Sequence, residues 1–184
     1  SCSARHQKRR NKMAYTKIRN FGVVERLGKM DVDIITVTPT IETSTIDAND
    51  VLFNPVEITN AVSVPGGRSL LHSICLIDQT NTSVDAGVEI DLVFTQDSTN
   101  LGTLDAAVDC ADTVLDGILG IINIGSGSYV DMINGQISTK NNVGLTLIGA
   151  SATSQSVYVG GVIRETGTAR AADAIDIRLG IIKD

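Results

Sequence analysis

The sequence predicts an all-β fold, a jelly-roll-like β-sandwich with one short helix and an extended N-terminal arm. Of its 184 residues, 42% are hydrophobic, only 3% are aromatic and none is Trp. The core must therefore be built from Val, Ile, Leu and Ala, and the β-branched members of this group favour strands. In the second half of the chain, apolar segments recur about every ten residues between Gly, Ser and Asn clusters, as in a sandwich or barrel. The length suits one domain with a sizeable core.

Residues 31–67 are expected to contain the first extended segments. Residues 31–47 are dense in Ile, Thr and Val and predict one or two strands interrupted at Pro39. Because proline cannot donate to a strand ladder, this position indicates the edge of a sheet. Residues 51–64 repeat the pattern, and Pro65–Gly67 predicts a tight turn.

The next two strands are predicted more clearly. Residues 68–78 are apolar on both faces, which indicates a strand in the middle of a sandwich. Residues 88–97 alternate apolar and polar side chains, which indicates one buried face and one mostly solvated face. Further strand segments are expected in the second half of the chain, at 118–124, 128–133, 136–139, 143–151, 156–165 and 174–184.

The one predicted helix lies between these strands and ends at Gly117. Helical i, i+3, i+4, i+7 spacing connects the apolar residues Leu104, Ala107, Val108, Ala111, Val114 and Leu115. The same periodicity would place four aspartates on one helix face, which we call the acidic stripe: Asp105, Asp109, Asp112 and Asp116. A solvated face is the ordinary explanation of such a stripe, and a docking surface for a cationic arm is the functional alternative.

Charge is strongly polarised along the chain. Residues 1–20 hold seven basic residues and no acidic one, whereas the remainder holds eight basic and 21 acidic residues, a formal charge of −13. We predict a basic arm over residues 1–30 and a sandwich body over 31–184. Because the body would repel phosphate, we expect no nucleic-acid partner for it. The predicted partner-binding residues are Arg5, Lys8, Arg9, Arg10, Lys12, Lys17 and Arg19 in the arm and Asp105, Asp109, Asp112 and Asp116 in the stripe.

Catalytic and metal-binding residues are scarce, so the sequence predicts no enzyme, no cofactor and no metal site. Of the two histidines, His6 lies in the arm and His72 in an apolar strand. Residues 125–128 (GSGS) lack the lysine and helix of a phosphate-binding loop. Glu89 and Asp91 share one side of a strand, but calcium needs six to eight converging oxygens.

The remaining sequence signals are also negative. Cys2, Cys75 and Cys110 are odd in number and lack zinc or disulfide spacing. No apolar run has the length of a membrane span, so no membrane partner is expected. No apolar segment of a secretory signal follows the basic start.

Four segments carry a resemblance to a known group of proteins: 50–78 (DVLFNPVEITNAVSVPGGRSLLHSICLID), 90–107, 142–162 and 175–184. Over residues 50–184 the chain resembles virion structural proteins of tailed bacteriophages of the capsid decoration or cement type. The resemblance implies a protein that binds and stabilises the outer surface of an icosahedral capsid. It also implies the major capsid protein as partner, a homo-oligomer with a trimer favoured, and assembly in the host cytoplasm.

Alternatives remain open at this stage. Another virion component, such as a head-to-tail or tail-surface protein, could share the same build. A receptor- or glycan-binding module on the virion is a further alternative, although few aromatic rings are available to stack on sugars. The arm could be strapped onto the acidic stripe or onto a negatively charged shell protein. Alternatively, translation could start at Met13, because Arg9-Arg10 can be encoded by a ribosome-binding sequence.

Overall fold

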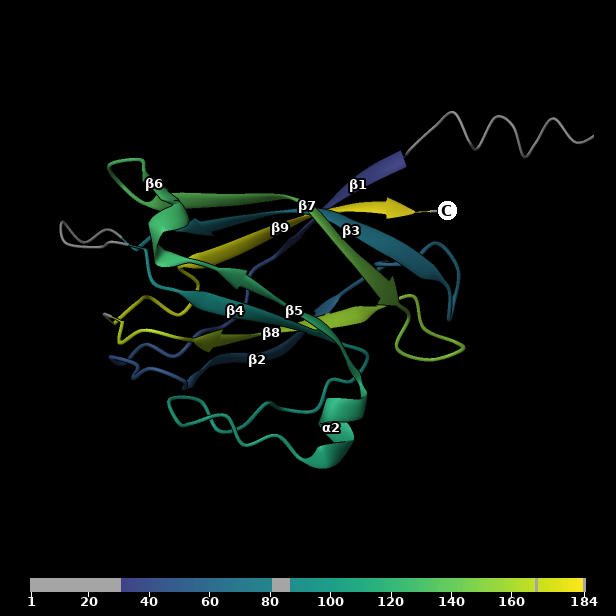
Figure 1. Ribbon diagram of the computed structural model, residues 1–184, viewed down its shortest axis with the longest axis horizontal. Coiled ribbons are helices and arrows are strands. Elements are labelled where there is room, and N and C mark those ends of the chain that lie inside the picture. Colours follow the sequence, from purple (N-terminus) through teal and green to yellow (C-terminus); the bar gives the residue numbers. More distant parts are fainter. Residues whose placement is uncertain (1–30, 81–86, 168, 184) are drawn as a thin grey trace, which may run out of the picture.

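The chain folds into two antiparallel sheets packed face to face, which confirms the predicted all-β, jelly-roll-like fold class (Figure 1). The computed structural model describes residues 31–80, 87–167 and 169–183, so the predicted basic arm lies outside the described residues. The five-stranded sheet has the order β1 (Asp31–Val37), β9 (Ile175–Lys183), β3 (Arg68–Asp78), β7 (Gln136–Ile148), β6 (Tyr129–Asp131). The four-stranded sheet has the order β2 (Val51–Ile58), β8 (Val157–Ile163), β4 (Ile90–Thr95), β5 (Ile118–Ile124).

The strand order within each sheet defines the jelly roll. Strand β9 lies between β1 and β3, and β8 lies between β2 and β4, so strands from the end of the chain separate strands from its beginning. The chain also alternates between sheets along most of its length, passing from β1 to β2, then to β3 and then to β4. Two interleaved Greek keys give this arrangement, which pairs strands that are remote in sequence.

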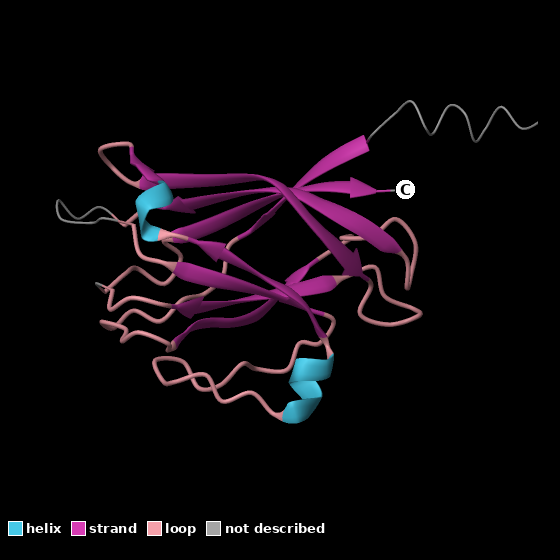
Figure 2. Ribbon diagram, in the orientation of Figure 1, coloured by secondary structure: helices cyan, strands magenta, loops and turns pink. Residues whose placement is uncertain are grey.

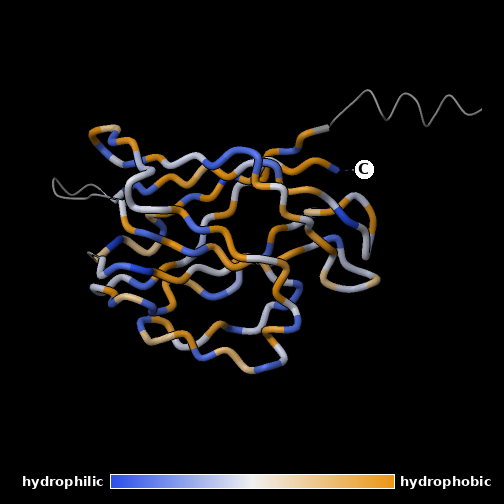
Figure 3. Tube along the Cα trace, viewed as in Figure 1, coloured by the Kyte–Doolittle hydropathy of each residue, from blue (hydrophilic) through white to orange (hydrophobic). Residues whose placement is uncertain are grey.

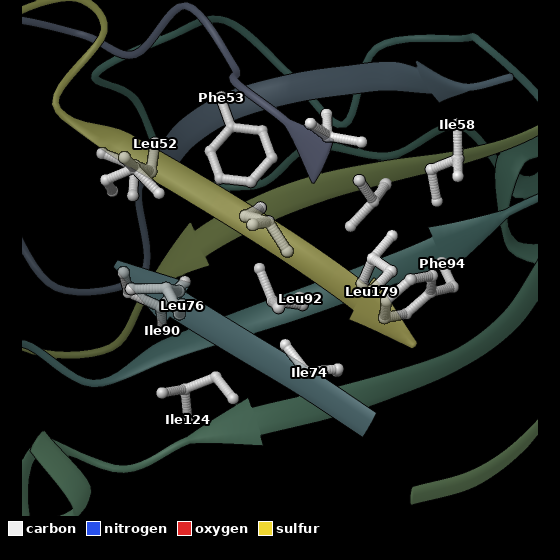
Figure 4. Close-up of a cluster of buried hydrophobic side chains, with 14 of the residues drawn as sticks. Leu52, Phe53, Ile58, Ile74, Leu76, Ile90, Leu92, Phe94, Ile124 and Leu179 are labelled. Carbon is white, nitrogen blue, oxygen red and sulfur yellow. The ribbon is translucent and has the colours of Figure 1, made fainter. Parts of the chain in front are cut away.

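The main core fills the space between the sheets with aliphatic side chains and two phenylalanines. Figure 4 shows Ile74, Leu76 and Leu179 of the five-stranded sheet facing Leu92 and Phe94 of the four-stranded sheet. All of these side chains are fully buried. The core therefore has the composition that the scarcity of aromatic residues predicts.

Several sequence predictions are confirmed in detail. Strand β3 occupies residues 68–78 and is the middle strand of its sheet. Pro39 follows β1, which is an edge strand. In the Pro65–Gly67 turn, the amide of Gly67 donates to the carbonyl of Val64 over 2.9 Å, and Gly66 has the positive φ of 66° that the turn requires.

The predicted helix is much shorter in the structure, where α2 covers only Asp112–Asp116 (Figure 2). Its predicted end at Gly117 is correct, because Gly117 is the C-cap residue. The first part is wrong, since the backbone of residues 104–108 pairs with the start of β2 instead. The amide of Asp105 donates to the carbonyl of Val51, and the amide of Val51 donates to the carbonyl of Ala106.

A second, small core covers the outer face of the four-stranded sheet, the face turned away from the other sheet. Leu101 and Val114 of the 98–117 segment pack there with Val51, Val93 and Val162 of the sheet. Gly160 of β8 makes room for this layer, because a Cβ at that position would lie 2.6 Å from Cδ1 of Leu101. The four-stranded sheet is thus covered on its outer face at β2, β8 and β4, whereas Ile121 of β5 stays exposed.

Candidate interaction surfaces

The outer face of the five-stranded sheet is apolar at its β1 end, and no described element packs over it. Strand register places Val32, Ile182 and Leu70 side by side on β1, β9 and β3. Val32 and Leu70 are exposed, and Ile182 is half-buried. Ile34, with 65% of its surface exposed, adjoins this row above Gly180. We call Val32, Ile34, Leu70 and Ile182 the apolar row.

Two arginines flank the apolar row on the same face. Arg68 lies two residues before Leu70 on β3, and Arg178 lies on β9; both are exposed. Neither forms a salt bridge with any other residue that the structure describes. The carboxylate of Asp176, also on this face, accepts hydrogen bonds from Thr38 and Gln79. This face therefore combines apolar side chains with available positive charge on an otherwise acidic body.

A second apolar group stands at the opposite end of the same sheet, in β6 and the turn that joins it to β7. Val130, Met132 and Ile133 are all exposed, and Ile133 is 88% exposed. Figure 3 shows apolar colouring at this turn, at the end of the sandwich away from β1. Ile133 has a φ of 74°, which is rare for a β-branched residue. Its neighbours close a γ-turn around it, since the amide of Asn134 donates to the carbonyl of Met132 over 2.9 Å.

The acidic stripe is not one helix face, which corrects the geometric prediction for its residues. Asp112 and Asp116 belong to α2, whereas Asp105 and Asp109 lie in the irregular segment before it. All four side chains are exposed, and Asp105 accepts a hydrogen bond from Ser44 over 2.9 Å. Two exposed apolar side chains accompany them in the same segment, Val108 and Leu115. The stripe is therefore a mixed acidic and apolar loop surface.

The carboxylates considered for calcium are engaged with protein groups. The side-chain amide of Asn123 donates to both Glu89 and Asp91, over 2.7 and 2.8 Å. Arg164 pairs with the other oxygen of Asp91 over 2.6 Å. Nowhere in residues 31–80, 87–167 and 169–183 do three or more His, Cys, Asp or Glu side chains form a group that could hold a metal ion.

A buried polar cluster lies at the end of β3 where the chain leaves the five-stranded sheet. Arg170 pairs with Asp78, and the phenol of Tyr129 donates to the carbonyl of Val88 over 3.1 Å. Burial raises the pKa of Tyr129, the negative charge of Asp78 raises it further, and Arg170 partly opposes the shift. These contacts join the end of β3 to the segment before β9, and β6 to the segment before β4, so we assign the cluster a structural role.

The remaining candidate residues lie apart from one another. His72 is half-buried at the bulge of β3, between Leu71 and Ser73. Residues 126–128 form a short 3₁₀ turn, η1 (Ser126–Ser128), leading into β6. Cys75 and Cys110 are free, and burial together with Asp109 raises the pKa of Cys110. Among the described helices, none is long and apolar enough to cross a membrane.

Sequence reasoning missed Arg68, Arg178 and the apolar row. Side chains two residues apart on a strand point to the same face of the sheet, so the sequence alone puts Val32 and Ile34 on one face of their strand, and Arg68 and Leu70 on one face of theirs. It does not say which face meets the core or which strands are neighbours, and both are needed to assemble a surface from three strands. A register prediction for β1, β9 and β3 would have supplied the missing signal.

Comparison with known proteins gives little further information. No family model matches the chain, and no curated protein matches it. Among solved structures, the chain is similar to one titled Desmodium yellow mottle tymovirus, with 14% sequence identity and a TM-score of 0.28. That alignment covers 82% of this chain and 86% of the other. A likeness of this size carries no argument about function, and the resemblance to tailed-phage proteins stays a prediction.

Proposed function

We propose that this protein is a non-enzymatic virion structural protein of the capsid decoration type, which binds and stabilises the outer surface of an icosahedral capsid. The observation that supports this most is the asymmetry of the sandwich. The outer face of the four-stranded sheet is covered at Val51, Val93 and Val162, whereas the outer face of the five-stranded sheet carries the apolar row without a described covering element. Exposed apolar groups on a rigid sheet suit a surface that becomes buried on assembly.

The chemistry of this face favours a protein partner, and the major capsid protein is the partner proposed. Stable protein interfaces bury about 1,600 Å² in total and centre on apolar side chains with a polar rim. The apolar row with Arg68 and Arg178 has that composition. The basic arm adds charge that can engage an acidic shell surface, and its contribution would be screened by salt over about 10 Å at 0.1 M.

Labelling of intact particles tests the proposal. Virions that contain the protein, as judged by mass spectrometry, are decorated with an antibody against it and imaged. We expect label over the whole shell. Label confined to one vertex would instead support the head-to-tail or tail-surface alternative, and absence of the protein from every purified virion would refute both.

A matched pair of variants locates the binding face. Leu70→Asp places a charge in the apolar row, and Ile121→Asp makes the same change at an exposed position of β5 in the other sheet. In a sedimentation assay with shells lacking the protein, Leu70→Asp is expected to lose binding and Ile121→Asp to keep it. Equal binding by the two variants would exclude this face from shell attachment.

A further inference from the structure

The apolar row and its two arginines need a partner surface that is both apolar and acidic. The face carries exposed Val32, Ile34 and Leu70, and Arg68 and Arg178 lack salt bridges among the described residues. A purely apolar partner would leave the guanidinium groups without counter-charge where they are desolvated, at a large cost. A purely acidic partner would leave the apolar side chains in water.

This chain itself presents a surface of the required composition. Leu115 is 54% exposed on α2, and Val108 is exposed in the segment before it. The four aspartates of the acidic stripe lie in the same segment and are exposed. None of the four forms a salt bridge with another described residue. Apolar side chains meet apolar side chains, and carboxylates meet arginines, if the two surfaces come together.

The two surfaces cannot meet within one molecule. The 98–117 segment packs on the outer side of the four-stranded sheet, whereas the apolar row lies on the outer side of the five-stranded sheet. Figure 1 shows α2 on the far side of the four-stranded sheet from β1 and β9. The whole thickness of the sandwich separates them, so contact requires a second molecule.

We infer that the outer face of the five-stranded sheet binds a second copy of this chain, through the acidic and apolar surface around α2 of that copy. The contact is heterologous, because different patches of the two copies meet, and the pair as a whole keeps one patch of each kind free. Such contacts form a ring when the rotation between copies closes and an open chain when it does not. The sheet face is the one proposed above to bind the shell, so on any one molecule the two contacts exclude each other, and we expect the self-association in the isolated protein, without shells.

Analytical ultracentrifugation of the purified full-length protein tests the inference without any shell. The weight-average mass of the wild type should rise with concentration up to about 1 mM, the range in which even weak contacts appear. Charge reversal on the sheet face (Arg68→Glu with Arg178→Glu) should hold the mass at that of the monomer. Charge reversal on the other surface (Asp112→Arg with Asp116→Arg) should do the same.

Mixing the two charge-reversed proteins is the decisive measurement. The first variant keeps a wild-type acidic surface and the second keeps a wild-type sheet face, so a heterologous contact forms again in a mixture. We expect the mixture to associate where each variant alone stays monomeric. A contact between two identical sheet faces would not be restored in this way, and a monomeric mixture would overturn the inference.

Controls separate specific pairing from general charge effects and from misfolding. Lys140→Glu and Asp173→Arg change charge at exposed positions outside both surfaces and should leave association unchanged. All variants should keep the wild-type melting transition. A further variant carries Gln at Arg5, Lys8, Arg9, Arg10 and Lys12. If this variant and the acidic-surface variant abolish association while the sheet-face variant does not, the acidic surface binds the arm instead. A monomeric wild type at every concentration would equally refute the inference, and the shell-binding assay would still test the proposed function on its own.

Discussion

The guanidinium Nε of Arg170 lies 3.1 Å from Oδ2 of Asp78, and both side chains are almost completely buried, with 2% and 3% exposed. The other oxygen of Asp78 accepts a hydrogen bond from the amide of Thr80 over 2.9 Å. The pair thereby ties the segment that precedes β9 to the end of β3. A buried pair contributes less than its Coulomb energy suggests, because both ions lose their hydration.

Replacement of Arg170 by Met should strongly destabilise the protein. The change leaves the carboxylate of Asp78 buried without its counter-ion, and breaking such a pair costs about 3–5 kcal/mol. Urea denaturation followed by circular dichroism measures the change in the free energy of unfolding. Arg178→Met, at an exposed arginine, is the control and should change it by less than about 0.5 kcal/mol. A loss at Arg170 no larger than that of the control would contradict the structural role of the pair.

Tyr129 should make stability fall in alkaline solution. Burial, followed by the charge of Asp78, raises the pKa of Tyr129 above its ordinary value of 10.0. The sign follows from linkage: below pH 10 the phenol is neutral in both states, and above it only the unfolded state loses the proton, so stability is lost as the pH rises. The melting temperature of the wild type should therefore fall between pH 9 and pH 11, and that of Tyr129→Phe should fall less. Tyr158→Phe is the control, and an identical alkaline loss in both variants would argue against the assignment.

Gly161 should not tolerate a side chain. A Cβ there would lie 2.1 Å from Cε1 of Phe53, which is fully buried, so Gly161→Ala forces the ring to move. Overpacking of this kind costs about 1–3 kcal/mol. Gly127→Ala is the control, because nothing lies within 4 Å of its Cβ. Adding Phe53→Leu should recover part of the loss, and a neutral Gly161→Ala would show that the core accommodates the methyl group.

Relief of backbone strain at Ile133 should stabilise the protein. Its φ of 74° is unfavourable for a β-branched side chain but open to glycine. The side chain is 88% exposed, so little packing is lost on its removal. We expect Ile133→Gly to raise the free energy of unfolding by about 1 kcal/mol, whereas Met132→Gly at the neighbouring position lowers it. Destabilisation by both variants to the same extent would mean that Ile133 makes contacts that offset its strain.

The fold class could be predicted from sequence because the relevant signals are local. Alternation over residues 88–97 correctly predicted buried Ile90, Leu92 and Phe94. Its prediction of a mostly solvated second face was wrong, because the second core buries Val93 on that face and Thr95 is buried as well. The two apolar faces of residues 68–78 correctly predicted a central strand. The predicted helix was too long because apolar spacing cannot show that another segment of the chain competes for the same backbone hydrogen bonds. The backbone of residues 104–108 forms its hydrogen bonds with Val51 of β2 and with Asn49, about 55 residues earlier in the chain.

The candidate surfaces were harder to predict, since each combines strands remote in sequence. Residues Val32, Leu70 and Ile182 become neighbours only when β9 pairs with both β1 and β3. The acidic stripe was predicted correctly as exposed but incorrectly as helical at Asp105 and Asp109. The net charge correctly predicted an acidic body. It could not predict that Arg68 and Arg178 lie on the same face as the apolar row.

The insertion of β9 between β1 and β3 has a consequence for how the protein is made. During synthesis, β1 and β3 emerge from the ribosome long before β9, the strand that lies between them. In the same way, β2 and β4 emerge long before β8. The four-stranded sheet stays open at its centre until β8 has been translated, and the five-stranded sheet until β9 has been translated. The contacts between β1 and β9 span about 150 positions, and such non-local pairing makes folding slow. A nascent chain thus exposes several unpaired strand edges, and on a crowded polysome neighbouring nascent copies are at risk of pairing with one another.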